Sequence, residues 1–72
     1  MDTRKIDACG LSCPQPALLT HQALHSMSGG TVEVWVDSAT ARDNVVRTAE
    51  KAGWHVSVHN QSNGSFKVLI TK

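Results

Sequence analysis

Residues 9–16 read Cys9-Gly10-Leu11-Ser12-Cys13-Pro14-Gln15-Pro16, and this stretch joins a predicted first strand to a predicted first helix. Gly10 breaks the strand, and Pro14 suits the first position of a helix, where a missing N–H group costs nothing. Pro16 falls in the same first turn, where the backbone donors have no partners within the helix. The stretch therefore predicts a helix that begins at Pro14, with Cys13 as its N-cap.

A cysteine at the start of a helix is well placed to become a reactive thiolate. The free N–H groups and the positive end of the helix dipole favour a negative charge there, which lowers the pKa of a thiol toward neutral pH. Free cysteines are more often small buried residues than nucleophiles. Here the two prolines and the Gly10 turn place Cys13 at a surface junction between loop and helix, where packing requires no sulfur. We therefore predict that Cys13 is a nucleophile.

Outward from this stretch, apolar residues recur with the period of strands and then with the period of helices. The pattern predicts strands at 4–9, 31–37, 54–59 and 65–71, helices at 14–27 and from 38 or 39 to 52, and a hairpin loop at 60–64. The predicted apolar faces of the two helices are Pro16, Leu19, Ala23, Leu24 and Met27, and Ala41, Val45, Ala49 and Ala52. The predicted inward residues of the strands are Ile6, Ala8, Val32, Val34, Val36, Trp54, Val56, Val58, Phe66, Val68 and Ile70.

The element order βαβαββ predicts an α+β fold, a two-layer sandwich with both helices on one face of a mixed four-stranded sheet. Two helices cannot cover both faces of such a sheet and still share one core. The chain has 72 residues, which is one domain, 1–72. Right-handed crossovers make the early strands parallel, so both helices start at the carboxyl edge of the sheet, where α/β proteins usually bind ligands. The loop with Cys13 and the stretch from Asp37 to Asp43 are therefore expected to be neighbours.

The second of these loops carries charged residues whose roles stay open at this point. Asp37 or Ser38 is the expected cap of the second helix, and Thr40 with Asp43 makes a partial capping box. Arg42 is either a stabilising charge for a Cys13 thiolate or an ordinary first-turn residue. Asp43 either caps the helix, orients Arg42, or is there because acidic residues favour first turns.

The stretch Gly10-Leu11-Ser12-Cys13-Pro14-Gln15-Pro16 resembles the Gly-x-x-Cys-Pro-x-Pro signature of the TusA/SirA-like sulfur-carrier family. Asp7 and the Asp37–Asp43 stretch are similar to that family's pattern, and the resemblance extends in register from about Ile6 to Thr71. The run from Asp37 to Val45 is closer to the branch with YedF-like proteins, some of which are linked to selenium metabolism.

The resemblance implies a small α/β sandwich whose cysteine, here Cys13, carries sulfur as a persulfide between other proteins. Gly10, Pro14, Pro16, Arg42 and Asp43 are the implied or expected supporting residues. Implied donors are cysteine desulfurases or rhodanese-like proteins, and implied acceptors act in tRNA thiolation, molybdenum cofactor supply or sulfur oxidation. Such a protein is more a cosubstrate than a self-sufficient catalyst, and we expect it to need no cofactor and to be a monomer.

Cys9 is the feature that the family signature does not require. One interpretation is a small, partly buried residue at the end of the first strand. The other is a resolving thiol that forms a reversible disulfide with Cys13, which requires Cα atoms within about 7 Å. His21 and His25 are four residues apart on the first predicted helix, a spacing that can bind zinc, but no glutamate lies between them. We therefore expect surface histidines and no metal.

Composition narrows the remaining function classes. The same βαβαββ plan resembles the C-terminal domain of translation initiation factor 3, so a regulatory or RNA-binding module is the alternative function. The net charge of +1, the absence of tyrosine and the single phenylalanine argue against direct nucleic-acid binding. Two cysteines are too few for a disulfide scaffold, and no apolar run reaches the ~20 residues that a membrane span needs. The sequence also has no pattern of a signal peptide, so the expected location is the cytoplasm.

On the outer face of the predicted sheet, Trp35 and Leu69 are less expected than the polar residues around them. They are either a patch that docks a partner or exposed side chains that the fold tolerates.

Overall fold

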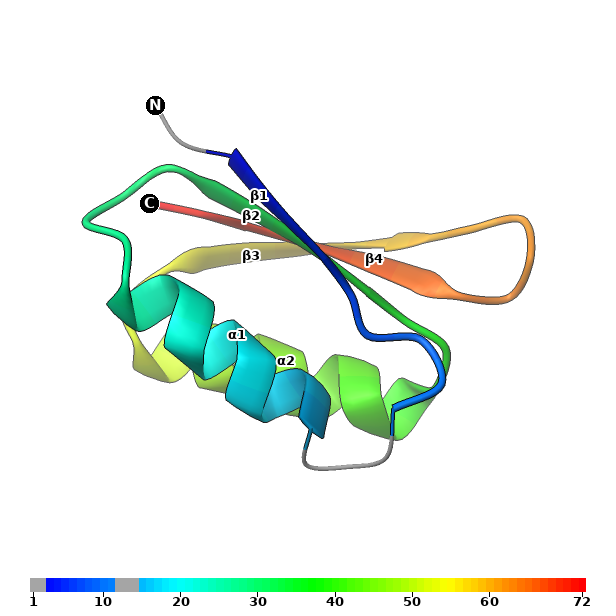
Figure 1. Ribbon diagram of the computed structural model, residues 1–72. Helices are drawn as coiled ribbons and strands as arrows, with labels where there is room; N and C mark the ends of the chain where they lie inside the picture. Colours follow the sequence, from blue (N-terminus) through cyan, green and yellow to red (C-terminus); the bar gives the residue numbers. More distant parts are fainter. Residues whose placement is uncertain (1–2, 12–14) are drawn as a thin grey trace.

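The computed structural model describes residues 3–11 and 15–72 (Figure 1). Its elements follow the order β1 (Thr3–Asp7), α1 (Gln15–His25), β2 (Thr31–Val36), α2 (Ala39–Lys51), β3 (His55–Asn60) and β4 (Phe66–Thr71). This is the predicted βαβαββ order. The observed strands and helices begin and end within one or two residues of the predicted positions. The predicted start of α1 at Pro14, with Cys13 as its N-cap, lies outside the described residues.

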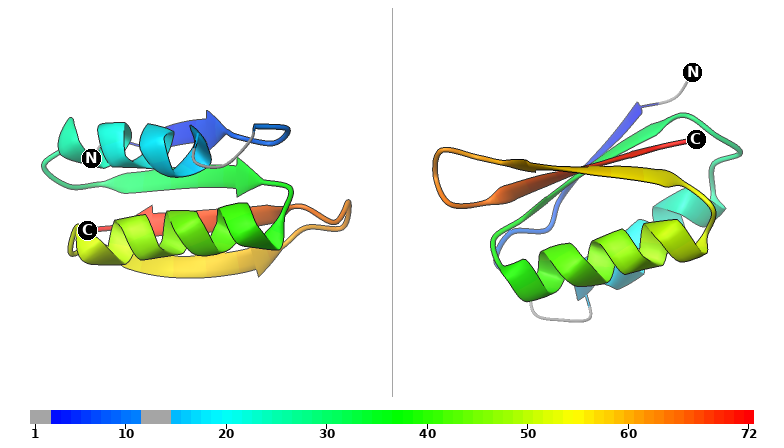
Figure 2. Two further views of the ribbon diagram at one scale, coloured as in Figure 1. Left: turned by 90° about the horizontal axis from the view of Figure 1, so that it is seen from below. Right: turned by 180° about the vertical axis from the view of Figure 1, so that it is seen from behind.

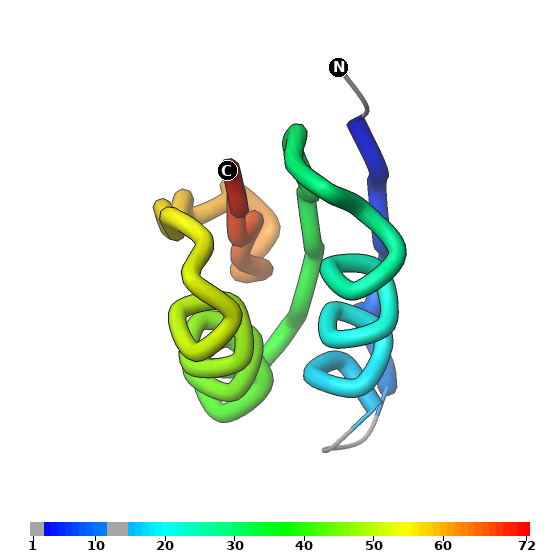
Figure 3. The backbone as a smooth tube through the Cα atoms, turned by 90° about the vertical axis from the view of Figure 1, so that its left-hand side faces the viewer, coloured from blue at the N-terminus to red at the C-terminus, as the bar shows by residue number. Residues whose placement is uncertain are grey.

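The four strands form one mixed sheet in the order β1-β2-β4-β3. β1 pairs in parallel with β2, and β4 pairs antiparallel with both β2 and β3. Both helices cover the same face, with α1 against β1 and β2 and α2 against β3 and β4 (Figures 2 and 3). The predicted two-layer α+β sandwich is therefore confirmed.

The core lies between the sheet and the helix layer, and the two central strands supply most of it. Val32, Val34 and Val36 of β2 and Val68 and Ile70 of β4 are fully buried, because alternate side chains of a strand point to the same face. The helices contribute the remaining large part, with Leu24 from α1 and Val45 and Ala49 from α2 fully or almost fully buried. Apolar alternation in the central strands thus places both helices on one face.

Helix α1 differs from its predicted apolar face at two positions. Thr20 is fully buried although the predicted apolar face did not include it, and its Oγ1 donates a hydrogen bond of 2.9 Å to the carbonyl oxygen of Pro16. A buried hydroxyl is tolerated once it is hydrogen-bonded. Leu19 is only half-buried because it lines an open hollow beside β1. The helix ends at His25, earlier than the predicted Met27.

Strand β3 differs from its prediction because it forms an edge of the sheet. Val58 was predicted to face inward, but 41% of it is exposed, although its partner Val68 on β4 is fully buried. The β3–β4 hairpin diverges from α2 toward its turn (Figure 1), and β3 has a neighbouring strand on one side only. Trp54, predicted as the first residue of the strand, lies just before it and is buried.

Helix α2 begins with Ser38 as its N-cap, whose Oγ accepts a hydrogen bond of 3.1 Å from the Ala41 N–H. This settles the choice between Asp37 and Ser38 as the cap. The predicted capping box of Thr40 and Asp43 was wrong, because that motif requires the cap residue itself and the residue three positions later, which is Ala41. Ala41, Val45 and Ala49 are buried as predicted, whereas Ala52 is half-buried. Neither described helix has the length and apolar character of a membrane span.

Candidate functional site

The candidate site lies where β1 and β2 end and both helices begin, at the lower right of Figure 1. One hydrogen bond joins the two loops at this edge. The backbone N–H of Gly10 donates to Oδ2 of Asp37 at 2.9 Å, across 27 residues of sequence. The prediction that these loops are neighbours is confirmed. The contact itself was not predicted, although the position of Asp37, directly after a strand that runs parallel to β1, is a signal for it.

The loop after β1 is held to the sheet by several backbone contacts. Ala8 N–H donates to the carbonyl oxygen of Trp35 at 2.8 Å, and Leu11 N–H donates to that of Ala8 at 3.3 Å. Gly10 has a φ of 81°, a left-handed conformation that residues with a Cβ rarely adopt. No atom lies within 4 Å of a Cβ built there. The backbone conformation, rather than crowding, therefore makes position 10 a glycine.

Cys13 and Pro14, together with Ser12, lie outside the described residues. The described chain approaches them through Gly10 and Leu11 and continues from Gln15, the first residue of α1. Pro16 is buried in the first turn of that helix, and its carbonyl oxygen accepts the hydrogen bond from Thr20. Both flanks of the Cys13 segment are thus fixed by packing and hydrogen bonds.

Cys9 is a free, exposed thiol, so its predicted partial burial was wrong. Its backbone N–H donates to Oδ1 of Asp7 at 3.2 Å. The pKa of the Cys9 thiol is raised, first by desolvation and then by the negative charges of Asp7 and Asp37 and by a side-chain hydrogen bond to Asp7. At neutral pH Cys9 is therefore held in its protonated, less nucleophilic form.

Arg42 and Asp43 form a pair at the start of α2. Arg42 Nε donates to Asp43 Oδ1 at 3.0 Å, and Nη2 lies 3.0 Å from the same oxygen. The guanidinium carbon also lies 4.8 Å from the ring centroid of Phe66, at the start of β4. Asp43 thus orients Arg42, one of the roles predicted for it, while Ser38 takes the capping role. The Phe66 contact was missed, because sequence spacing does not show which strand lies beside α2.

The histidine pair on α1 has its rings in contact, since the His21 and His25 ring centroids are 4.1 Å apart. Within residues 3–11 and 15–72, no group of three or more His, Cys, Asp or Glu side chains is arranged to hold a metal ion. On the other face of the sheet, Trp35 and Leu69 are half-buried, and whether they dock a partner stays a prediction. Among the described residues, the edge with Gly10 and Asp37 therefore remains the candidate functional site.

The described residues on either side of the Cys13 segment are held in place at this edge. Asp37 ties down the loop from β1, Gly10 turns it, and α1 begins immediately beyond the undescribed residues. The N-terminus of a helix favours a nearby negative charge, which is what a thiolate or persulfide carries.

Comparisons with known proteins agree on one family. A family model described as "Sulfurtransferase TusA" matches residues 4–72. A provisionally named sulfur carrier protein of Methanocaldococcus jannaschii is 34% identical over 70 residues, which covers 96% of this chain and 93% of the relative. The sulfur carrier protein TusA of Pseudomonas putida is 26% identical over 68 residues, with 93% and 85% covered.

A solved structure gives the same result for the fold. The crystal structure of a SirA-like protein from Desulfitobacterium hafniense superposes with a TM-score of 0.90 at 34% identity. The alignment covers 94% of this chain and 95% of that one. Nearly all of both chains is aligned, so the two proteins share the whole two-layer fold.

Proposed function

This chain belongs to the family of the sulfurtransferase TusA, and from that membership we propose that it is a sulfur carrier that holds sulfane sulfur as a persulfide on Cys13. The observation that carries the proposal is the family match over residues 4–72, which includes the whole Cys-Pro-x-Pro stretch. The hydrogen bond between Gly10 and Asp37 supports Cys13 as the site, because it positions the loop that leads to this residue.

The proposed loading step is a transfer of sulfur between two thiols. The Cys13 thiolate attacks the outer sulfur of a donor persulfide, R–S–SH. A bond forms between Cys13 Sγ and that sulfur, the S–S bond of the donor breaks, and the donor leaves as the thiolate R–S⁻. Charge, protons and oxidation level balance, since Cys13–S⁻ and R–S–SH become Cys13–S–SH and R–S⁻. In delivery, an acceptor thiolate attacks the outer sulfur of the Cys13 persulfide, the S–S bond breaks, and Cys13 leaves as the thiolate.

TusA-family sulfur carriers interact with protein donors and acceptors. For this chain we propose a cysteine desulfurase or a rhodanese-like protein as donor, and an acceptor in tRNA thiolation, cofactor sulfur supply or sulfur oxidation. The chain then acts more as a cosubstrate than as a self-sufficient catalyst. A persulfide carrier requires free thiols, which reducing compartments maintain, and this favours the cytoplasm as its location. We also propose that the chain is a monomer.

Intact-protein mass spectrometry tests the proposal directly. The reduced protein is incubated with inorganic polysulfide, or with a cysteine desulfurase and cysteine, and its mass is compared before and after reduction. We expect a gain of one sulfur atom that reduction removes, that is absent in Cys13→Ser and that persists in Cys9→Ser. The matched serine variants separate the two thiols, and an unchanged mass with every donor would refute the carrier function.

A thiol switch between Cys9 and Cys13 is the second candidate, and the exposure of Cys9 favours it. It predicts a loss of two hydrogens without added sulfur. It also predicts that Cys9→Ser abolishes function, whereas a carrier with Cys13 as its site tolerates this change. The raised pKa of Cys9 slows its attack on any sulfur at neutral pH, so we rank the switch second.

A further inference from the structure

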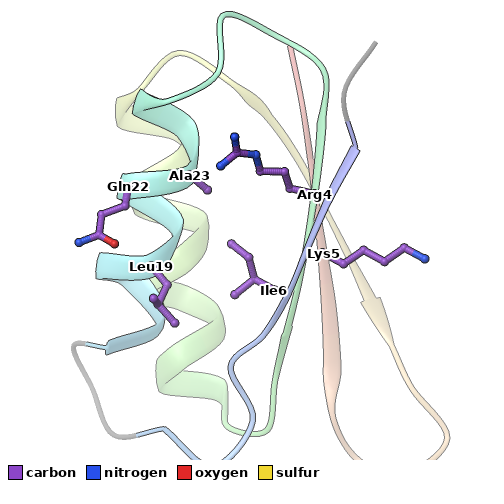
Figure 4. A pocket seen from close by; sticks show the side chains of 6 residues that line it. All are labelled: Arg4, Lys5, Ile6, Leu19, Gln22 and Ala23. Atoms are coloured by element: carbon purple, nitrogen blue, oxygen red, sulfur yellow. The ribbon is translucent and has the colours of Figure 1, made fainter.

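A hollow of about 410 Å³ lies between β1 and α1, on the side of the molecule where α1 covers the edge strand. We call it the β1–α1 hollow, and its lining residues are Arg4, Lys5, Ile6, Leu19, Gln22 and Ala23. Figure 4 shows the side chains of Arg4, Ile6, Leu19 and Ala23 on the inner side, between strand and helix, while Lys5 points to the opposite face of β1. The floor of the hollow is thus apolar, and a guanidinium stands at one end of it.

Two exposed leucines belong to the segments on either side of Cys13. Leu11 is 40% exposed and Leu18 is 51% exposed, and the third large exposed apolar residue of the described chain, Val58, lies on the distant hairpin. Residues four apart on a helix are neighbours on its surface, so Leu18 lies beside Gln22, which lines the hollow. Exposed apolar side chains of this size on the segments that lead into and out of a candidate site indicate an interaction surface.

Charge indicates what the hollow accepts. Among residues 3–11 and 15–72, no carboxylate lines the hollow, and the ion pairs are Arg42 with Asp43 and Lys67 with Glu33. Arg4 therefore has no carboxylate partner among the described residues. A guanidinium beside an apolar floor is complementary to an apolar side chain with a carboxylate next to it.

We propose that the β1–α1 hollow, with Leu11 and Leu18, docks a segment of the protein that donates sulfur to this chain. An apolar side chain of that segment enters the hollow against Ile6 and Leu19, and a neighbouring carboxylate pairs with Arg4. This inference rests on the proposed function and adds the surface that recognises the donor. The occupant is a protein segment because an apolar floor and an unpaired guanidinium match neighbouring side chains of a polypeptide. The helix that forms one wall of the hollow also begins at Gln15, directly after the Cys13 segment.

The test compares two loading reactions on the same variants. Inorganic polysulfide loads sulfur without docking, whereas the cysteine desulfurases and rhodanese-like proteins of the same genome, assayed one at a time, must dock. For Leu18→Ser and Arg4→Met, we expect the KM for the protein donor to rise about tenfold, as for truncation of an interface hot spot. The kcat and the rate of loading by polysulfide stay at wild-type values. The Arg4→Met effect shrinks at high salt, because an exposed charge pair is screened.

Matched controls remove the same kinds of group elsewhere. Val58→Ser removes an exposed apolar side chain from β3, and Arg47→Met removes an exposed guanidinium from α2. The proposal would be overturned if the hollow variants and these controls had equal KM values. It would also be overturned if polysulfide loaded the chain and no protein donor did. Self-association that Leu18→Ser abolishes would identify a second copy of this chain as the occupant and also overturn it. Failure of both polysulfide and every protein donor to load the wild type would instead refute the proposed function.

Discussion

The hydrogen bond from Gly10 to Asp37 predicts different outcomes for two substitutions of the same residue. Asp37→Ala removes both the acceptor oxygen and the negative charge, whereas Asp37→Asn removes the charge and keeps an oxygen that can accept from the Gly10 N–H. Two measurable quantities depend on these features separately. Stability depends mainly on the hydrogen bond at 2.9 Å, and the pKa of the Cys9 thiol depends on the Asp37 charge.

The size of the stability effect follows from the exposure of the contact. A hydrogen bond to a charged acceptor contributes about 1.5–3 kcal/mol, but this one is exposed, so water replaces part of it and about 1 kcal/mol remains. The Asp37 carboxylate also precedes the N-cap of α2, where a negative charge contributes about 0.5 kcal/mol. We expect Asp37→Ala to lower the free energy of unfolding by about 1.5 kcal/mol and Asp37→Asn by about 0.5 kcal/mol.

The effect on Cys9 has the same sign in both variants. The Asp37 charge raises the pKa of the thiol by disfavouring the thiolate, so its removal lowers the pKa and increases the thiolate fraction at any pH below the midpoint. The measurement is the rate of alkylation by iodoacetamide against pH, in a Cys13→Ser background so that Cys9 is the only thiol. We expect the midpoint to shift to lower pH in both Asp37→Asn and Asp37→Ala.

Urea unfolding, followed by circular dichroism, supplies the stability values for the same proteins. Asp43→Asn is the matched control, since its carboxylate pairs with Arg42 and not with Gly10, and we expect no shift of the Cys9 midpoint in that variant. Equal destabilisation by Asn and Ala at position 37 would show that Asp37 does not hold Gly10 through a hydrogen bond. An unchanged Cys9 midpoint would show that the Asp37 charge does not reach the loop.

The remaining predictions concern the elements that position this edge, and urea unfolding measures all of them. Ser38→Ala removes the N-cap of α2 and is expected to cost about 1 kcal/mol, with Ser38→Asp close to wild type. Thr20→Val keeps the shape of a buried side chain but removes its bond to Pro16, at a cost of about 1 kcal/mol; a stabilised variant would contradict this account. Ile70→Val, in the fully buried part of β4, is expected to cost about 1 kcal/mol, and Ile70→Ala about 2–5 kcal/mol, enough to unfold much of a chain this small. Unfolding midpoints of these two variants that match wild type would mean that β4 does not form the core.

Much of the fold could be predicted because the local patterns are strong. The alternation in 31–37 and 65–71 and the helical spacing of Ala41, Val45 and Ala49 depend only on the periods of strand and helix. Parallel pairing of β1 and β2 followed from the handedness of crossovers. The edge of the sheet that carries the candidate site could then be predicted, because parallel strands that precede helices bring their loops to the same side.

The deviations occur where exposure depends on a distant neighbour. Val58 fits the inward pattern of a strand but is exposed, because β3 is an edge strand and its hairpin diverges from α2. Thr20 has a polar side chain and is fully buried by the packing around α1, which its hydroxyl tolerates because it bonds to Pro16 within the helix. Cys9 fitted a strand end, yet β1 ends at Asp7, and the loop beyond it exposes the thiol.

Local sequence patterns alone were enough to predict the order of the elements and the two-layer class, and they are the basis for proposing Cys13 within a Gly-x-x-Cys-Pro-x-Pro stretch. These features follow from side-chain periodicity and from the backbone limits of glycine and proline, which act between residues close in sequence. Only the tertiary structure decided that Asp37 holds Gly10 across 27 residues, that Arg42 lies over Phe66 and that a hollow remains between β1 and α1. Each of these depends on the position of one element against another, which packing of the complete sheet and helix layer sets and no local pattern encodes.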